Sequence, residues 1–218
     1  LNADATRPPH AAEAALMLRV VRRLERLGES LLDYARVRPP QTRPVNLHTL
    51  VEEAITLVRL DRETGRVNLT NQTPVDLILE CDWDRMVQVL VNLLRNAADA
   101  IRSAGEHPEL PFPRPPEERR HAAIAGSVVV AADLSSREGQ DWVSITVSDT
   151  GPGIDPDMLS RLFEPFASTR LDARGTGLGL AVTEGIVKEH GGLILARNRA
   201  DCPGAVFEIL LPRRAPSP

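Results

Sequence analysis

The sequence is poor in aromatic residues and in lysine. Its 218 residues include two Trp, one Tyr and four Phe, and Lys188 is the single lysine. A surface that stacks nucleic-acid bases needs aromatic side chains together with a positively charged face. The formal net charge is −4, so the composition argues against a nucleic-acid partner.

Cysteine and long apolar runs are also scarce. Cys81 and Cys202 are far apart and form no CxxC or metal-type spacing, so the sequence suggests neither a disulfide framework nor a zinc site. No apolar run approaches the roughly 18 residues of a membrane-spanning helix. The chain begins at Leu1 without an initiator Met or a signal-peptide pattern, and we therefore expect a fragment of a longer protein.

The N-terminal part predicts one helix over residues 10–36 and then a linker. Apolar residues recur at alternating spacings of three and four, which predicts a seam that packs on a partner helix or a second copy, with an ordinary core helix as the alternative; they are Met17, Val20, Leu24, Leu27, Leu31 and Tyr34. Prolines at 39, 40 and 44 end the helix. We place a domain boundary in this Pro-rich linker, 36–44.

The remaining sequence mixes helices and strands without regular βαβ alternation, which predicts an α+β fold. Asn46 is expected to cap a helix, and Asp82 is expected to open the next one. A Pro-rich stretch at 103–121 predicts an exposed insertion, with a polyproline docking segment as the alternative. The expected elements are helices over 47–60, 82–101 and 177–190, and strands over 66–71, 76–80, 124–132, 141–148, 193–198 and 205–212.

The helix predicted over 82–101 carries one narrow polar stripe on an otherwise apolar surface. Gln88, Asn92, Asn96 and Asp99 follow one another at helical spacing. Carboxamides that face a core are costly unless they are hydrogen-bonded. The stripe therefore predicts a polar cavity that holds a ligand, a metal or water, with a plain solvent-facing stripe as the alternative.

Two glycine-rich turns flank a candidate lid. In DTGPGI (149–154), Asp149 ends a strand, and a buried carboxylate there suits an exocyclic amine. In GTGLGLAV (175–182), the glycines run directly into a helix, whose N-terminus favours phosphate. Between them lies 162–174, where Phe163 and Phe166 are expected to anchor a mobile lid and Arg170 and Arg174 to contact phosphate.

Taken in order, the Asn92/Asn96 pair, DTGPGI, LFEPF and GTGLGLAV resemble the catalytic ATP-binding domain of bacterial sensor histidine kinases. These enzymes belong to the superfamily shared with gyrase, Hsp90 and MutL, and the likeness here is to the nitrogen-regulatory class. The resemblance covers about 45–212. It implies a two-layer α/β sandwich, in which helices cover one face of a mixed, mainly antiparallel sheet, preceded by a helical dimerisation segment.

The resemblance also implies domain bounds and residue roles. Residues 1–44 would be a partial dimerisation and phosphotransfer helix with its linker, and 45–218 the catalytic domain with the 103–121 insertion. Asn96 would ligate Mg²⁺, Asn92 would orient phosphate or metal-bound water, and Asp149 would accept the adenine N6 amine. Other ATP contacts would come from Asp99, Gly151, Gly153, Ile154, Phe166, Thr169, Arg170, Gly175, Thr176, Gly177, Leu178, Gly179 and Leu180. Asp99 is a departure, because many relatives have a basic residue there.

A phosphoacceptor box of the H-E-x-x-N-P type is missing. None of the five histidines has that context; they are His10, His48, His107, His121 and His190. His190 lies near a helix end and is interpreted as a cap. The resemblance thus implies a kinase fragment that binds ATP and Mg²⁺ and phosphorylates a histidine outside the fragment. That histidine would belong to its own or a sister full-length chain and would pass the phosphoryl group to a response regulator.

Further expectations follow from the same resemblance. The full-length protein is expected to be a homodimer in the cytoplasm, or to have this part as the cytoplasmic end of a membrane-anchored sensor. Two alternatives stay open: a degenerate module that binds nucleotide or a partner without kinase activity, and an anti-sigma-type serine kinase.

Overall fold

The computed structural model describes residues 13–14, 17–18, 20–21, 28, 39–61, 67–106, 126–137, 140–167 and 177–213. The described part of the predicted 10–36 helix is helical at each of its residues, but Leu24, Leu27, Leu31 and Tyr34 of the seam lie outside the described residues. The pairing of that helix and the domain boundary at the linker stay predictions.

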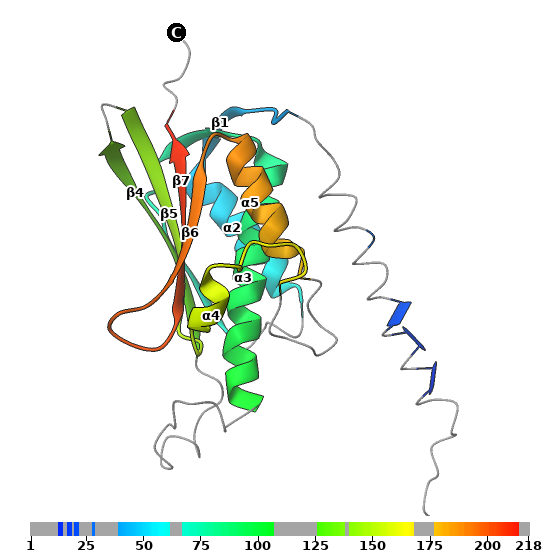
Figure 1. The fold of residues 1–218 in the computed structure, drawn as a ribbon. Helices are drawn as coiled ribbons and strands as arrows, with labels where there is room; N and C mark the ends of the chain where they lie inside the picture. Colours follow the sequence, from blue (N-terminus) through cyan, green and yellow to red (C-terminus); the bar gives the residue numbers. More distant parts are fainter. Residues whose placement is uncertain are drawn as a thin grey trace, which may run out of the picture.

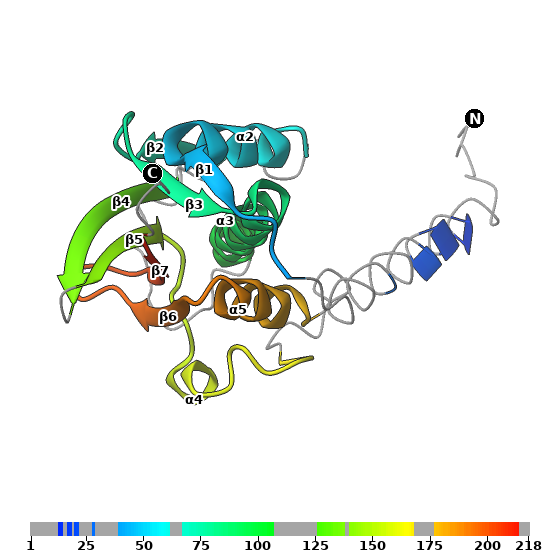
Figure 2. The same ribbon diagram turned by 90° about the horizontal axis from the view of Figure 1, so that it is seen from above.

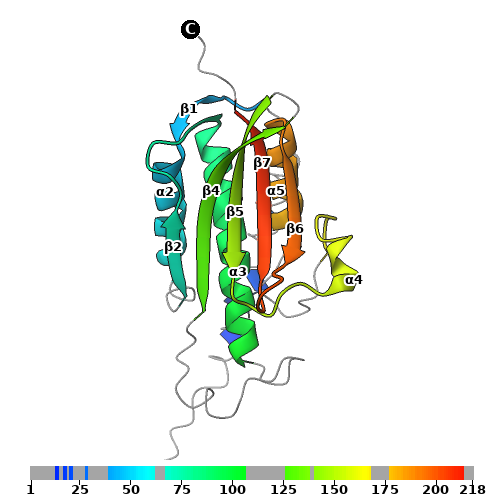
Figure 3. The same ribbon diagram turned by 90° about the vertical axis from the view of Figure 1, so that its left-hand side faces the viewer.

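One five-stranded sheet forms the first layer, with the strand order β2–β4–β5–β7–β6. β2 pairs with β4 in parallel and the other neighbours are antiparallel, as Figure 3 shows face-on. The mixed, mainly antiparallel sheet is thus confirmed. Its strands are β2 (Asn68–Gln72), β4 (Ser127–Arg137), β5 (Gln140–Asp149), β6 (Leu193–Asn198) and β7 (Ala205–Pro212).

Helices form the second layer on one face of that sheet (Figures 1 and 2). They are α2 (Leu47–Arg59), α3 (Trp83–Glu106) and α5 (Gly179–Glu189). A short antiparallel pair, β1 (Arg43–Asn46) with β3 (Ile78–Cys81), lies at one end of the helical layer. The short helix α4 (Pro156–Leu159) lies beside the β6 edge. The architecture is the predicted two-layer α/β sandwich.

The packing follows from the sequence pattern. In β5, Val143, Ile145 and Val147 are buried, while the serines and threonine between them are partly exposed, as expected for a strand with one buried face. Asn46 caps α2 by accepting a hydrogen bond from the Thr49 N–H at 2.9 Å, which confirms the predicted cap. Buried residues of α2, α3, α5 and the sheet belong to one hydrophobic core.

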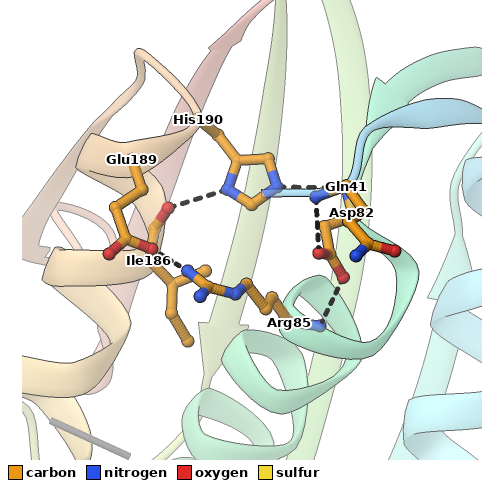
Figure 4. Close-up of polar contacts among 6 residues, drawn as sticks. All are labelled: Gln41, Asp82, Arg85, Ile186, Glu189 and His190. Atoms are coloured by element: carbon orange, nitrogen blue, oxygen red, sulfur yellow. Dashed lines mark hydrogen bonds and ion pairs between the residues drawn. The ribbon is translucent and has the colours of Figure 1, made fainter. Parts of the chain in front are cut away.

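His190 caps α5 and also joins it to the start of α3 (Figure 4). Its ring is buried, and Nε2 accepts a hydrogen bond from the Asp82 N–H at 3.0 Å. Since Nε2 accepts, the proton is on Nδ1, which lies 2.8 Å from the Ile186 carbonyl oxygen. The predicted capping role of His190 is confirmed, and the bond to α3 is an addition that the sequence did not indicate.

Asp82 connects the same junction to the linker. One carboxylate oxygen accepts from the Arg85 N–H at 3.3 Å, as an N-cap does, and the other accepts from the Gln41 N–H at 2.9 Å. Arg85 and Glu189 form an ion pair between α3 and α5. The linker backbone at Gln41 is therefore bonded to the residue that precedes α3, and through Asp82 and His190 it is connected to the end of α5 (Figure 4).

Several predicted ends differ from the observed ones. α3 continues to Glu106 rather than 101, since no proline follows Ile101 until Pro108; the first four residues of the predicted 103–121 insertion are therefore helical, and 107–125 lie outside the described residues. β4 continues to Arg137 rather than 132, because its pairing with β5 extends to the hairpin end.

Two short elements were not predicted. Strand β1 was not predicted because it lies in the Pro-rich linker; it includes Pro44 at an edge position. Helix α4 is a single turn inside a loop. The described residues contain no helix that is both long and apolar enough to cross a membrane.

The two cysteines differ in chemical accessibility, and this tests the packing of β3. Cys81 is buried and Cys202 is exposed. Burial, assisted by the nearby Asp82 and opposed by Arg43, raises the pKa of the Cys81 thiol from 9.0 to about 12. At pH 8 we expect a chromogenic thiol reagent to modify one thiol in the native protein and both in denaturant, and to modify none in native Cys202→Ser.

The same pKa shift predicts how stability depends on pH. The folded state raises the pKa of Cys81. The neutral thiol therefore contributes fully to the free energy of unfolding below pH 9, and this contribution decreases as the pH rises towards 12. In the thiol-reagent experiment, a native Cys81 that reacts as fast as Cys202 would contradict the buried position of β3.

Candidate nucleotide-binding site

The polar stripe of α3 faces the first turn of α5 at Asn92. Asn92 Nδ2 donates to the Gly179 carbonyl oxygen at 3.3 Å, and Thr183 Oγ1 donates to the same oxygen at 2.9 Å. Asn92 and Asn96 are partly buried, whereas Leu90, Leu93 and Leu94 of the same helix are fully buried in the core. The structure thus places Asn92 beside the glycine-rich turn, although the two lie far apart in the sequence.

Asp99, the last residue of the stripe, pairs with a cation on its own helix. Arg102 Nη2 lies 2.7 Å from Asp99 Oδ1, and the two side chains are partly exposed. Arg102 therefore supplies positive charge next to the position where Asp99 departs from the family pattern. Sequence reasoning missed Arg102, although its spacing of three residues from Asp99 is the signal for such a pair.

Asp149 is a buried carboxylate held by backbone N–H groups. It ends β5, its residue exposure is 3%, and Oδ1 accepts from Gly151 N at 2.7 Å and from Ala205 N at 3.3 Å. A Cβ on Gly151 would lie 2.9 Å from Asp149 Oδ1, so glycine permits this close approach. The predicted buried acceptor is present, and the fold fixes its orientation.

The Gly153–Ile154 backbone is held by Asn198, at the end of β6. Asn198 Oδ1 accepts from Ile154 N at 2.6 Å, and Asn198 Nδ2 donates to the Ile154 carbonyl oxygen at 2.8 Å. Gly153 has a φ of +87°, and the Ile154 side chain packs against the core. Sequence reasoning missed Asn198, because it belongs to no motif and its contact spans 44 residues.

A backbone contact joins the candidate lid to the glycine-rich turn that follows it. Phe166 N donates to the Gly177 carbonyl oxygen at 2.9 Å, and both residues have positive φ. Phe163 packs against the core as expected for an anchor, but the Phe166 side chain is 63% exposed, so Phe166 anchors the segment through its backbone only. Thr169, Arg170, Arg174, Gly175 and Thr176 lie outside the described residues.

The N-terminus of α5 is the third part of the site. Leu178 occupies the N-cap position without a side-chain cap hydrogen bond, and Gly179 and Leu180 begin the helix. A helix N-terminus without a capping side chain presents N–H groups and a positive partial charge to an anion. Because Asn92 contacts Gly179, this helix end lies directly beside the stripe.

The described residues contain no group of three or more His, Cys, Asp or Glu side chains that could hold a metal by themselves. Mg²⁺ takes oxygen ligands and is commonly bound by one or two side chains together with substrate phosphates. Asn96 lies one turn of α3 away from Asn92, and its carboxamide oxygen fits a Mg²⁺ site that is shared with substrate phosphates.

Comparison with known proteins identifies the class of this domain. Residues 81–215 match the histidine kinase-, DNA gyrase B-, and HSP90-like ATPase family. The match covers more than half of the chain, so the chain belongs to this family, and ATP binding is the family's shared property.

The curated proteins that the chain resembles include bacterial sensor histidine kinases. It is 34% identical over 202 residues to the sensor histidine kinase ZraS of Salmonella typhi, covering 91% of this chain and 37% of ZraS. It is 31% identical over 201 residues to the sensory histidine kinase/phosphatase NtrB of Rhodobacter capsulatus, covering 90% of this chain and 51% of NtrB. The chain thus spans about a third to a half of the length of these relatives.

Solved structures agree with the fold. The catalytic domain of the histidine kinase ThkA superposes with a TM-score of 0.60 at 27% identity, covering 79% of this chain and 96% of that domain. ThkA in complex with the response regulator protein TrrA gives a TM-score of 0.67 at 25% identity, covering 98% of this chain and 53% of ThkA. The domain is therefore a catalytic ATP-binding domain of the sensor histidine kinase type.

Substitution of Gly177, with Gly185 as a control, tests the backbone geometry where Phe166 meets Gly177. A Cβ on Gly177 would lie 2.7 Å from Phe166 Cα and at a φ of +68°. We expect Gly177→Ala to lower the free energy of unfolding by about 1–3 kcal/mol. Gly185, on an exposed face of α5, has nothing within 4 Å, and Gly185→Ala should raise it by about 0.5–1 kcal/mol.

Denaturant titration of both variants measures these changes. Equal effects of the two substitutions would show that Gly177 does not need its left-handed backbone conformation.

Proposed function

We propose that this chain is the catalytic part of a sensor histidine kinase, which binds Mg-ATP and transfers the γ-phosphoryl group to a histidine outside the chain. The observation that carries the proposal is that the N-terminus of α5 and the turn after β5 both lie against α3, where a Cβ on Gly151 would lie 3.3 Å from Ala100 Cβ. The stripe of α3 meets the N-terminus of α5 at Asn92 and Gly179, and Asp149 at the end of β5 supplies a buried, oriented carboxylate.

The adenine side of the site is assigned to Asp149 and the loop that follows it. A carboxylate accepts hydrogen bonds and donates none when ionised, so it favours the exocyclic amine of adenine over the carbonyl oxygen that guanine carries at the same position. Gly151 and Gly153 allow the backbone to lie close to the base, and Ile154 supplies apolar contact. The backbone N–H groups of Gly151 and Ala205 hold the carboxylate in place before the nucleotide arrives.

The phosphate side is assigned to α3 and to the α5 turn. Asn92 orients phosphate or metal-bound water, and backbone N–H groups of Gly177, Leu178, Gly179 and Leu180 contact phosphate oxygens. Asn96 holds Mg²⁺, and the bound ion supplies neutralisation of the negative charge on the transferring phosphoryl group. Thr169, Arg170, Gly175 and Thr176 complete the lid contacts. Catalysis by these residues is mainly positioning and charge complementarity.

The acceptor and partners belong to the larger protein. The described histidines are engaged structurally: His190 caps α5, and His48 Nδ1 lies 2.9 Å from the Thr73 carbonyl oxygen. We place the phosphoacceptor outside these 218 residues, in the same full-length protein or in the sister copy of a homodimer, which acts in the cytoplasm. The similarity to ThkA, whose complex with TrrA is known, supports a response regulator as the next acceptor.

Phosphotransfer from labelled ATP tests the proposed reaction. The chain is mixed with a longer form of the same protein that includes the preceding residues. We expect labelled phosphate that is lost in acid and retained in base, as phosphohistidine is. Acid-stable label on serine would favour an anti-sigma-type kinase, and good ATP binding without any transfer would favour a degenerate binding module.

A single substitution tests the metal assignment. Asn96→Ala removes the carboxamide oxygen while leaving the apolar face of α3 unchanged, and we expect Mg²⁺-dependent ATP binding to be lost in calorimetry. Asn71→Ala is the matched control, because Asn71 braces β2 to α2 through the His48 carbonyl oxygen and the Glu52 carboxylate, away from the site. Unchanged Mg-ATP affinity in Asn96→Ala would remove Asn96 from the metal site.

A further inference from the structure

We propose that Asn198 is a positioning residue for base selection, which acts by fixing the Gly153–Ile154 backbone relative to Asp149. The inference rests on the proposed function, since it takes adenine to be the group that Asp149 recognises. Asn198 itself lies at the end of β6, outside every motif of the nucleotide site. Its role is therefore to hold another residue in place.

The contact between Asn198 and Ile154 uses both ends of the carboxamide. Ile154 N donates to Oδ1 at 2.6 Å and Nδ2 donates to the Ile154 carbonyl oxygen at 2.8 Å, so one side chain satisfies both backbone groups of one residue. Asp at this position has only acceptors when ionised, and Ala has neither donor nor acceptor. Asn is therefore suited to this contact in a way that Asp and Ala are not.

Gly153 brings the loop close enough for this contact. A Cβ at Gly153 would lie 2.9 Å from Asn198 Oδ1 and 3.4 Å from the Gly204 carbonyl oxygen. The loop backbone thus lies directly against the β6–β7 hairpin, and its φ of +87° suits glycine.

The other strand of the same hairpin holds Asp149. Ala205 N donates to Asp149 Oδ1 at 3.3 Å. A Cβ on Gly204 would lie 2.0 Å from the Asp149 carbonyl oxygen, so the chain can pass here only as glycine.

Asn198 and Ala205 are partners in the β6–β7 ladder. One member of this cross-strand pair holds Ile154 and the other holds Asp149, so the ladder sets the spacing between the carboxylate and the loop. Two neighbouring strands therefore fix the two sides of the proposed base pocket. Loosening either contact changes the fit of the base, whereas the phosphate side at Asn92 and Gly179 is on other elements.

Nucleotide selectivity tests this role. Calorimetry with Mg-ATP and Mg-GTP is carried out on the wild type, Asn198→Ala, Asn198→Asp and the control Asn71→Ala. We expect the preference for ATP over GTP to fall about tenfold in both Asn198 variants, because a misplaced pocket wall discriminates poorly. Asn71→Ala should keep the wild-type preference, and thermal midpoints of the Asn198 variants should stay within about 4 °C of the wild type.

Asp149→Asn separates this inference from the proposed function. It places an amide where the proposed carboxylate acceptor is, and it should abolish the ATP preference. If Asp149→Asn loses selectivity while both Asn198 variants keep it, Asn198 is not a positioning residue although the base assignment stands. If the Asn198 variants lose stability but keep the ATP-to-GTP ratio, their role is structural and the inference is overturned. A wild type without ATP preference would overturn the adenine role of Asp149, and the inference with it.

Discussion

The buried carboxylate of Asp149 is the constraint on which the rest of the site depends. Burying a charge is costly unless hydrogen bonds replace its hydration, and two backbone N–H groups, from Gly151 and Ala205, provide part of that replacement. These donors come from the turn after β5 and from the start of β7. The chain must therefore pass close to Asp149 at two points, and glycine permits this at 151, beside the carboxylate, and at 204, beside the backbone carbonyl of Asp149.

Helix α3 connects the core with the site. One side of it lies in the hydrophobic core together with the sheet and α2, and the polar stripe on its other side meets α5 at Asn92. The ends of α3 and α5 are further tied by His190 and Asp82, and Asp82 also binds the linker backbone at Gln41 (Figure 4). Helix α5, which begins at the proposed phosphate site, thus ends at the junction with the linker.

Much of the fold was predictable because local patterns and tertiary packing agree. The alternation in β5, the Asn46 cap, the glycine turn after Asp149 and the run from Gly177 directly into a helix were all expected and were all found. The parallel pairing of β2 with β4, the strand β1 and the full length of β4 were not, because each depends on a partner strand elsewhere in the chain. Strand pairing of this kind has little local signature.

The sequence by itself determined the class of the domain and proposed the residues of its nucleotide site. The ordered motifs around Asn92, Asn96, Asp149 and the glycine turns depend on residue type and spacing, which a single chain displays directly. Only the tertiary structure decided that Asn92 meets Gly179, that Arg102 balances Asp99 and that Asn198 holds Ile154. Two of these contacts join segments distant in the chain, and a hydrogen bond between distant segments leaves no periodicity in the sequence; the Arg102 pair is local, but its effect depends on where α3 meets the site.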